Sequence, residues 1–85
     1  MFQPSAALTI NNAKPALEAG LQAIQSGQAE FDLALLTTVD SAAVATLITW
    51  RRAAMQRGLV LRFVNVPPSL RNLADLYGVA ELLHH

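Results

Sequence analysis

The strongest constraint on the fold of this chain is the alternation of two kinds of apolar segment. Short segments rich in strand-forming residues occur at residues 6–10, 31–36 and 59–66. Segments with the apolar spacing of a helix follow them, at residues 13–25, 42–57 and 70–77. Because only short connections join these segments, the order predicts an α/β layer with parallel strands, the short first strand being free to pair in either direction. We therefore expect residues 1–85 to form one domain, with a small mixed β-sheet of about four strands and helices packed on it.

The expected helices and strands can be assigned apolar faces. Residues 31–36 are apolar except for Asp32, which indicates a central strand covered on both faces. Each expected helix is followed by a glycine, a residue suited to a left-handed C-terminal cap. The core-facing residues expected on the second helix are Val44, Leu47, Ile48, Ala54 and Met55. Those expected on the third helix are Leu70, Leu73, Ala74 and Tyr77.

The composition narrows the classes of partner. Lys plus Arg and Asp plus Glu number six each, so the chain has no net field to attract nucleic acid or an anionic membrane. Charged residues make up 14% of the sequence, against about 25% in an average soluble domain. We infer that part of the apolar surface belongs to a partner protein. The first residues lack the pattern of a signal peptide and no apolar run approaches a membrane span, which predicts a cytosolic chain.

The sequence carries no constellation for catalysis or metal binding. There is no cysteine, and the two histidines, His84 and His85, close the chain as native residues or as the start of a purification tag. The four glycines form neither of the phosphate-binding patterns. We therefore expect no enzymatic activity, no metal and no cofactor.

The junction at residues 37–44 places a hydroxyl group at the start of the second helix. Asp40-Ser41 precedes a helix N-terminus, whose unpaired N–H groups and dipole accept negative charge. The Asp-Ser pair has two interpretations. Either side chain caps the helix, or Ser41 is a functional residue that hydrogen-bonds to a partner or is phosphorylated. Ala42, Ala43 and Val44 are small or apolar and allow a close approach to a partner.

Trp50 and Arg51 lie further along the same helix. The ring of Trp50 either packs against its own domain or anchors a protein interface, and the spacing does not decide between them. Arg51 belongs either to a solvated helix face or to the edge of an interface, where arginine is enriched.

In the order of its elements and in these residues, the chain resembles the STAS domain family. The central strand of that family enters an Asp-Ser or Asp-Thr pair at a helix start, here residues 31–39 followed by Asp40-Ser41. The 61–66 strand and the helix that ends at Gly78-Val79 also resemble the family pattern. The resemblance covers nearly the whole chain, implies a STAS-like α/β fold, and is greatest to compact members of the MlaB type.

This resemblance implies a noncatalytic subunit that binds the cytoplasmic ATPase of an Mla phospholipid-transport ABC complex and supports its assembly and activity. Such a subunit is cytoplasmic and reaches the inner membrane only through the complex. The expected partner-binding residues are Asp40, Ser41, Ala42, Ala43, Val44, Trp50 and Arg51.

The alternative is an anti-sigma-factor antagonist that binds an anti-sigma kinase and is switched by phosphorylation of Ser41. In regulatory members a second hydroxyl residue and a glycine follow the pair, where this chain has Ala42 and Ala43, which favours the transporter subunit. A homodimer stays open in either case.

Overall fold

The computed structural model describes residues 1–83, and the question of whether His84 and His85 are native lies outside them. In these residues three α-helices, one 3₁₀ helix and four short strands follow one another along the chain. Their bounds are β1 Ala7–Leu8, α1 Ala13–Gln25, β2 Glu30–Asp32, β3 Thr38–Val39, α2 Ser41–Gln56, β4 Arg62–Val64, α3 Pro68–Leu76 and η1 Ala80–Leu83.

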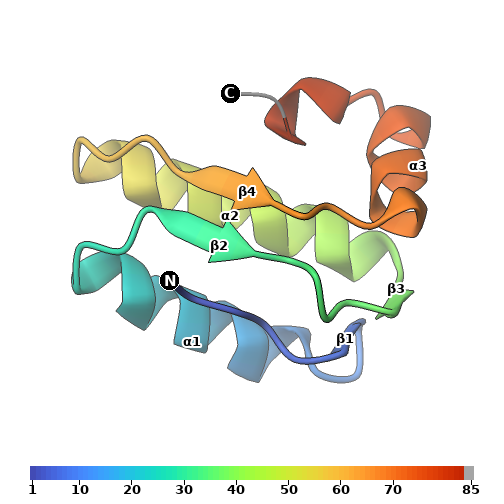
Figure 1. Cartoon of the computed structure of the whole chain (residues 1–85), viewed down its shortest axis with the longest axis horizontal. Coiled ribbons are helices and arrows are strands. Elements are labelled where there is room, and N and C mark those ends of the chain that lie inside the picture. Colours follow the sequence, from blue (N-terminus) through green and yellow to red (C-terminus); the bar gives the residue numbers. More distant parts are fainter. Residues whose placement is uncertain (84–85) are drawn as a thin grey trace.

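The strands form two parallel pairs that share one central segment. β1 pairs with β3, and β2 pairs with β4 in the register that sets Phe31 beside Phe63. A parallel bridge between Phe2 and Phe31 adds the N-terminal segment to the other side of β2. The central segment 30–39 therefore runs between the N-terminal residues and β4 (Figure 1). The α/β fold with four strands is confirmed, and every ladder between the described strands is parallel.

The prediction of one continuous central strand is wrong. The chain leaves the strand after Asp32, whose Oδ1 accepts a hydrogen bond of 2.9 Å from the N–H of Ala34. The N–H of Leu36 then bonds to the carbonyl of Leu33 at 3.1 Å, which closes a turn. The turn buries both Leu33 and Leu36 and exposes Leu35. The apolar residues Leu33 and Leu36 thus reach the core from a turn and not from a strand. An aspartate that accepts a hydrogen bond from the backbone two residues later is typical of such turns.

The helices agree with the sequence more closely than the strands do. α1 has the predicted bounds, and Gly27 follows it with a φ of +89°. Four predicted core residues lie outside the core, since Met55 is 67% exposed, Tyr77 is 52% exposed, and Ile48 and Leu73 are partly exposed. Tyr77 is exposed because α3 ends at Leu76 and Tyr77 is its C-terminal cap.

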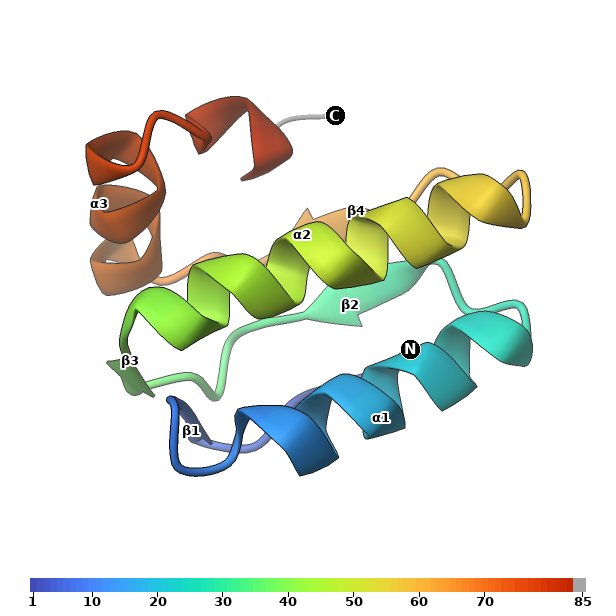
Figure 2. The same ribbon diagram turned by 180° about the vertical axis from the view of Figure 1, so that it is seen from behind.

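α1 and α2 cover the same face of the strand layer, and α3 with η1 lies beyond β4 (Figures 1 and 2). The core between these layers is aromatic: the ring centroid of Phe31 lies 5.1 Å from that of Trp50 and 6.3 Å from that of Phe63. Both pairs are close to edge-to-face, the arrangement that aromatic quadrupoles favour. Trp50 is fully buried, and its Nε1–H donates to the carbonyl of Leu17 on α1 at 3.0 Å.

The close contact between Gly20 and Trp50 predicts an unusual effect of a glycine substitution. A Cβ at Gly20 would overlap the indole ring, which is rigid and buried. Although Gly→Ala inside a helix normally stabilises by about 0.5–1 kcal/mol, we expect Gly20→Ala to lower the free energy of unfolding by about 1–3 kcal/mol through overpacking. Urea denaturation followed by the fluorescence of Trp50 measures this change.

Gln22→Ala, at an exposed position of the same helix, is the control and should leave the midpoint nearly unchanged. A stabilised Gly20→Ala protein would contradict the packing described here.

Candidate functional site

Asp40 joins the start of α2 to the turn that follows β1. Its Oδ1 accepts a hydrogen bond of 2.8 Å from the N–H of Ala42, and its Oδ2 accepts one of 3.1 Å from the N–H of Ile10. Asp40 is therefore the N-cap of α2, with an extended backbone. Because Asp40 fills this role, the cap does not need the hydroxyl of Ser41, which is exposed on the first residue of the helix.

The turn at residues 9–12 is held from both sides. The side chain of Asn12 accepts a hydrogen bond of 2.8 Å from the N–H of Thr9 and donates one of 2.7 Å to the carbonyl of Ala7. Ile10 lies between Thr9 and Asn12 in this turn, and its N–H donates to the carboxylate of Asp40. The side chain of Ile10 is nevertheless 76% exposed. The sequence analysis placed Ile10 at the end of a strand, but the strand ends at Leu8 and Ile10 lies on the tip of this turn.

Two grooves flank the exposed side of α2 near its start. The first lies between α1 and α2 and has a volume of about 370 Å³; its lining residues are Ile10, Ala13, Leu17, Ser41, Ala42, Ala45, Thr46 and Thr49. The second lies between α2 and the segment that ends α3, with a volume of about 280 Å³; its lining residues are Ser41, Val44, Ala45, Ile48, Tyr77 and Val79. Ser41 and Ala45 line both grooves and form the ridge between them.

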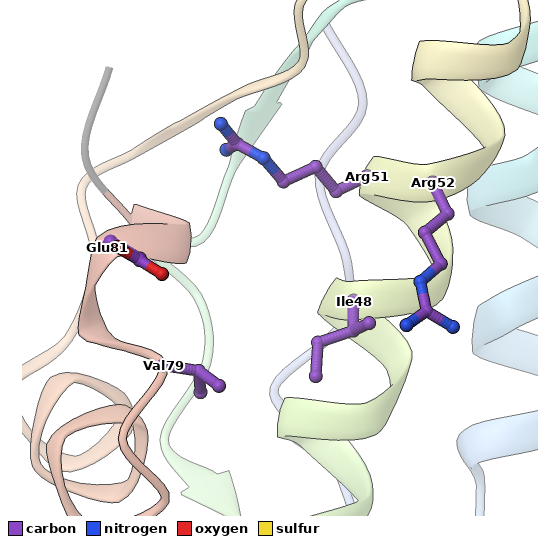
Figure 3. Close-up of a pocket in the computed structure, with 5 residues that line it drawn as sticks. All are labelled: Ile48, Arg51, Arg52, Val79 and Glu81. Carbon is purple, nitrogen blue, oxygen red and sulfur yellow. The ribbon is translucent and has the colours of Figure 1, made fainter.

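The second groove continues along α2 toward charged residues. Ile48 and Val79 also line a neighbouring hollow of about 480 Å³, together with Arg51, Arg52 and Glu81. Figure 3 shows Ile48 on α2 and Val79 on the opposite wall, with Arg51 reaching toward the side of η1 that carries Glu81. The residues that line the two grooves thus include no Asp, Glu, Lys or Arg, and the first charged residue of α2 is Arg51, about three turns after Ser41.

The structure separates the predicted partner-binding residues into two groups. Asp40, Ser41 and Ala42 lie at or near the surface, and Arg51 lines the charged hollow. Ala43 is fully buried, and Val44 reaches the second groove with a small exposed fraction. That Asp40, Ser41, Ala42, Val44 or Arg51 contacts a partner stays a prediction, whereas the fully buried Ala43 offers no exposed side chain for such a contact.

The assignment of Trp50 to an exposed partner-binding surface is wrong. Its indole ring fills the space between α1 and the strand layer and is fully buried. The spacing of apolar residues along α2 did not decide whether Trp50 is buried, because its burial depends on where α1 packs.

Five surface residues were missed by the sequence analysis. Ala45 and Ile48 follow Ser41 by four and seven residues, which is the spacing of one helix face, so this part of the surface had a sequence signal. Ile10, Tyr77 and Val79 come from distant segments and had none. Among residues 1–83 no group of three or more potential ligands is placed to hold a metal ion. None of the described helices has the length and apolar character needed to cross a membrane.

The double role of Asp40 predicts a measurable loss of stability. Asp40→Ala removes the cap of α2 and the bond to Ile10, and we expect the free energy of unfolding to fall by about 1–2 kcal/mol. Asp40→Asn keeps one acceptor oxygen and should lose less. Chemical denaturation followed by the fluorescence of Trp50 compares these variants with Asp75→Ala, the exposed control on α3. Equal midpoints for Asp40→Ala and Asp75→Ala would show that the cap is not a stabilising contact.

The chain matches a known protein family. The family described as the MlaB STAS domain matches residues 5–84, nearly the whole chain. A comparison with curated protein sequences found no significant match. The matched range includes the Asp40-Ser41 junction and the elements that form both grooves. The chain therefore belongs to the family of MlaB-type STAS domains.

Proposed function

We propose that this STAS domain is a noncatalytic subunit that binds the cytoplasmic ATPase of an Mla-type phospholipid-transport ABC transporter and supports its assembly and activity. Membership of the MlaB-type family supports this assignment. The structural observation that carries it is the uncharged surface around Ser41, where two grooves flank the ridge of α2. In this proposal the domain reaches the cytoplasmic side of the membrane through the ATPase.

The shape and chemistry of this surface suit a protein partner. Ser41 and Ala45 on the ridge are small, so a partner can approach the backbone of α2 closely. The grooves on both sides accept apolar side chains, and burial of that surface supplies about 25 cal/mol per Å² of apolar area. The hydroxyl of Ser41 supplies a hydrogen bond at the centre of the contact.

Phosphorylation of Ser41 would oppose this contact. It would add about −1.5 to −2 charges beside two grooves whose lining residues carry none. In the free domain the dipole at the N-terminus of α2 favours that charge, whereas the neighbouring N-cap carboxylate of Asp40 opposes it. The partner would have to bury the charge, and binding would weaken.

The second candidate function is an anti-sigma-factor antagonist. The exposed hydroxyl of Ser41, which the cap of α2 does not use, favours it because a kinase needs such access. In that case a serine kinase would bind the domain and modify Ser41, and the ATPase would not bind.

The transporter proposal predicts that charge on the ridge weakens ATPase binding. We expect Ser41→Asp and Ala45→Arg to raise the Kd for the purified ATPase subunit of the same organism by at least about tenfold, because each buries an unpaired charge. Ser41→Ala removes only the central hydrogen bond and should raise the Kd less, by about threefold to tenfold. Biolayer interferometry measures the affinities, and ATPase assays measure the functional effect.

Ala19→Arg is the matched control, since Ala19 is also an exposed alanine in the middle of a helix but lines neither groove. Wild-type protein that fails to bind the ATPase and is phosphorylated at Ser41 by a copurifying kinase would support the sigma-factor switch instead.

A further inference from the structure

We propose that the turn at residues 9–12 forms the second half of the ATPase-binding surface, with Ile10 as its apolar anchor and Asp40 as the residue that positions it. This inference rests on the proposed function and adds a residue outside α2 to the site. The partner would straddle the ridge at Ser41 and Ala45 and contact both α1 and α3.

The first argument is that Ile10 is both exposed and fixed. Its side chain is 76% exposed at the mouth of the groove between α1 and α2. Its backbone is held by the carboxylate of Asp40, and the turn around it is closed by the side chain of Asn12. A residue whose backbone is already ordered loses no further backbone entropy on binding, and a β-branched side chain has few rotamers to lose, which suits Ile10 to the role of an interface anchor.

The second argument is the area that a stable complex requires. Such an interface buries about 800 Å² on each partner. The whole domain exposes 4804 Å², so the contact would cover about one sixth of it. One narrow groove does not supply that area. The ridge with both grooves and the turn at Ile10 forms a continuous surface, because Ser41 and Ala45 line both grooves.

The third argument is the distribution of charge, which specifies the partner. The residues that line the two grooves include no Asp, Glu, Lys or Arg. The exposed Arg52 lines the neighbouring hollow beyond the second groove, together with Arg51 and the exposed Glu81. The complementary surface of the ATPase is therefore apolar where it covers Ile10 and Ser41, with an acidic side chain opposite Arg52.

Asp40 connects these features. One oxygen caps α2, and the other holds Ile10 beside the start of that helix. Serine or asparagine would serve as a cap about as well. Only a side chain with two acceptor oxygens, however, serves both N–H groups at the same time.

The test is the affinity of the full chain for the purified ATPase subunit. We expect Ile10→Ala to raise the Kd about tenfold and Ile10→Lys about a hundredfold. Val60→Lys is the matched control, because Val60 is a β-branched residue that is 73% exposed beyond the opposite end of α2. Circular dichroism and the fluorescence of Trp50 verify that each variant is folded.

The outcomes separate this inference from the proposed function. If the wild type does not bind the ATPase, both are overturned. If the wild type binds and Ile10→Lys binds equally well, only the role of Ile10 is overturned. If Ile10→Lys abolishes self-association but leaves ATPase binding intact, the turn belongs to a contact between two copies of this chain, and the inference is wrong.

A double-mutant cycle tests the positioning role of Asp40. We expect Asp40→Asn to weaken ATPase binding about threefold to tenfold in the wild-type background and to have almost no effect in the Ile10→Ala background. A residue that only stabilised the fold would have the same effect in both backgrounds. Equal effects would therefore overturn the positioning role.

Discussion

The packing of Trp50 is the interaction on which the remainder of the structure depends. The indole ring extends from α2, contacts Phe2 and Phe31 in the strand layer, and donates its N–H to the backbone of α1. A buried N–H without an acceptor costs about 1–3 kcal/mol, so the bond to Leu17 is what allows the ring to be fully inside. Gly20 supplies the space in α1 that the ring occupies. One side chain thus sets the distance between the two helices and anchors both to the strands.

The candidate site is a consequence of this packing. With α1 held beside α2, a groove remains between them on the solvent side. The second groove arises because Leu70 and Ala74 hold α3 to the core while the helix ends at Leu76 and leaves Tyr77 at the surface. The side of α2 that faces solvent therefore has a groove along each edge, and both grooves are formed by the elements that build the core.

The junction before α2 combines a helix cap with an exposed hydroxyl residue. The chain belongs to the MlaB-type STAS domains, and the matched range includes this aspartate and the hydroxyl residue that follows it. Here the two residues divide the tasks: Asp40 is fully used by backbone N–H groups, and Ser41 stays exposed. The hydroxyl of Ser41 is thus not needed for the helix cap. The carboxylate of Asp40, which forms that cap, also bonds to the N–H of Ile10 in the turn at residues 9–12.

The sequence by itself determined the α/β class, the bounds of α1 and the junction at Asp40-Ser41, because these follow from local periodicity, capping and turn chemistry; the family followed from the resemblance to the STAS pattern. It did not determine that the apolar run after Phe31 breaks into a turn, since buried leucines at positions 33 and 36 fit a turn as well as a strand. It also did not determine the placement of Trp50 or Ile10. Whether a residue is interior or exposed depends on which distant segment packs against it. α1 covers Trp50, and the carboxylate of Asp40 holds the backbone of Ile10 at the surface. Only the tertiary structure brings those segments together.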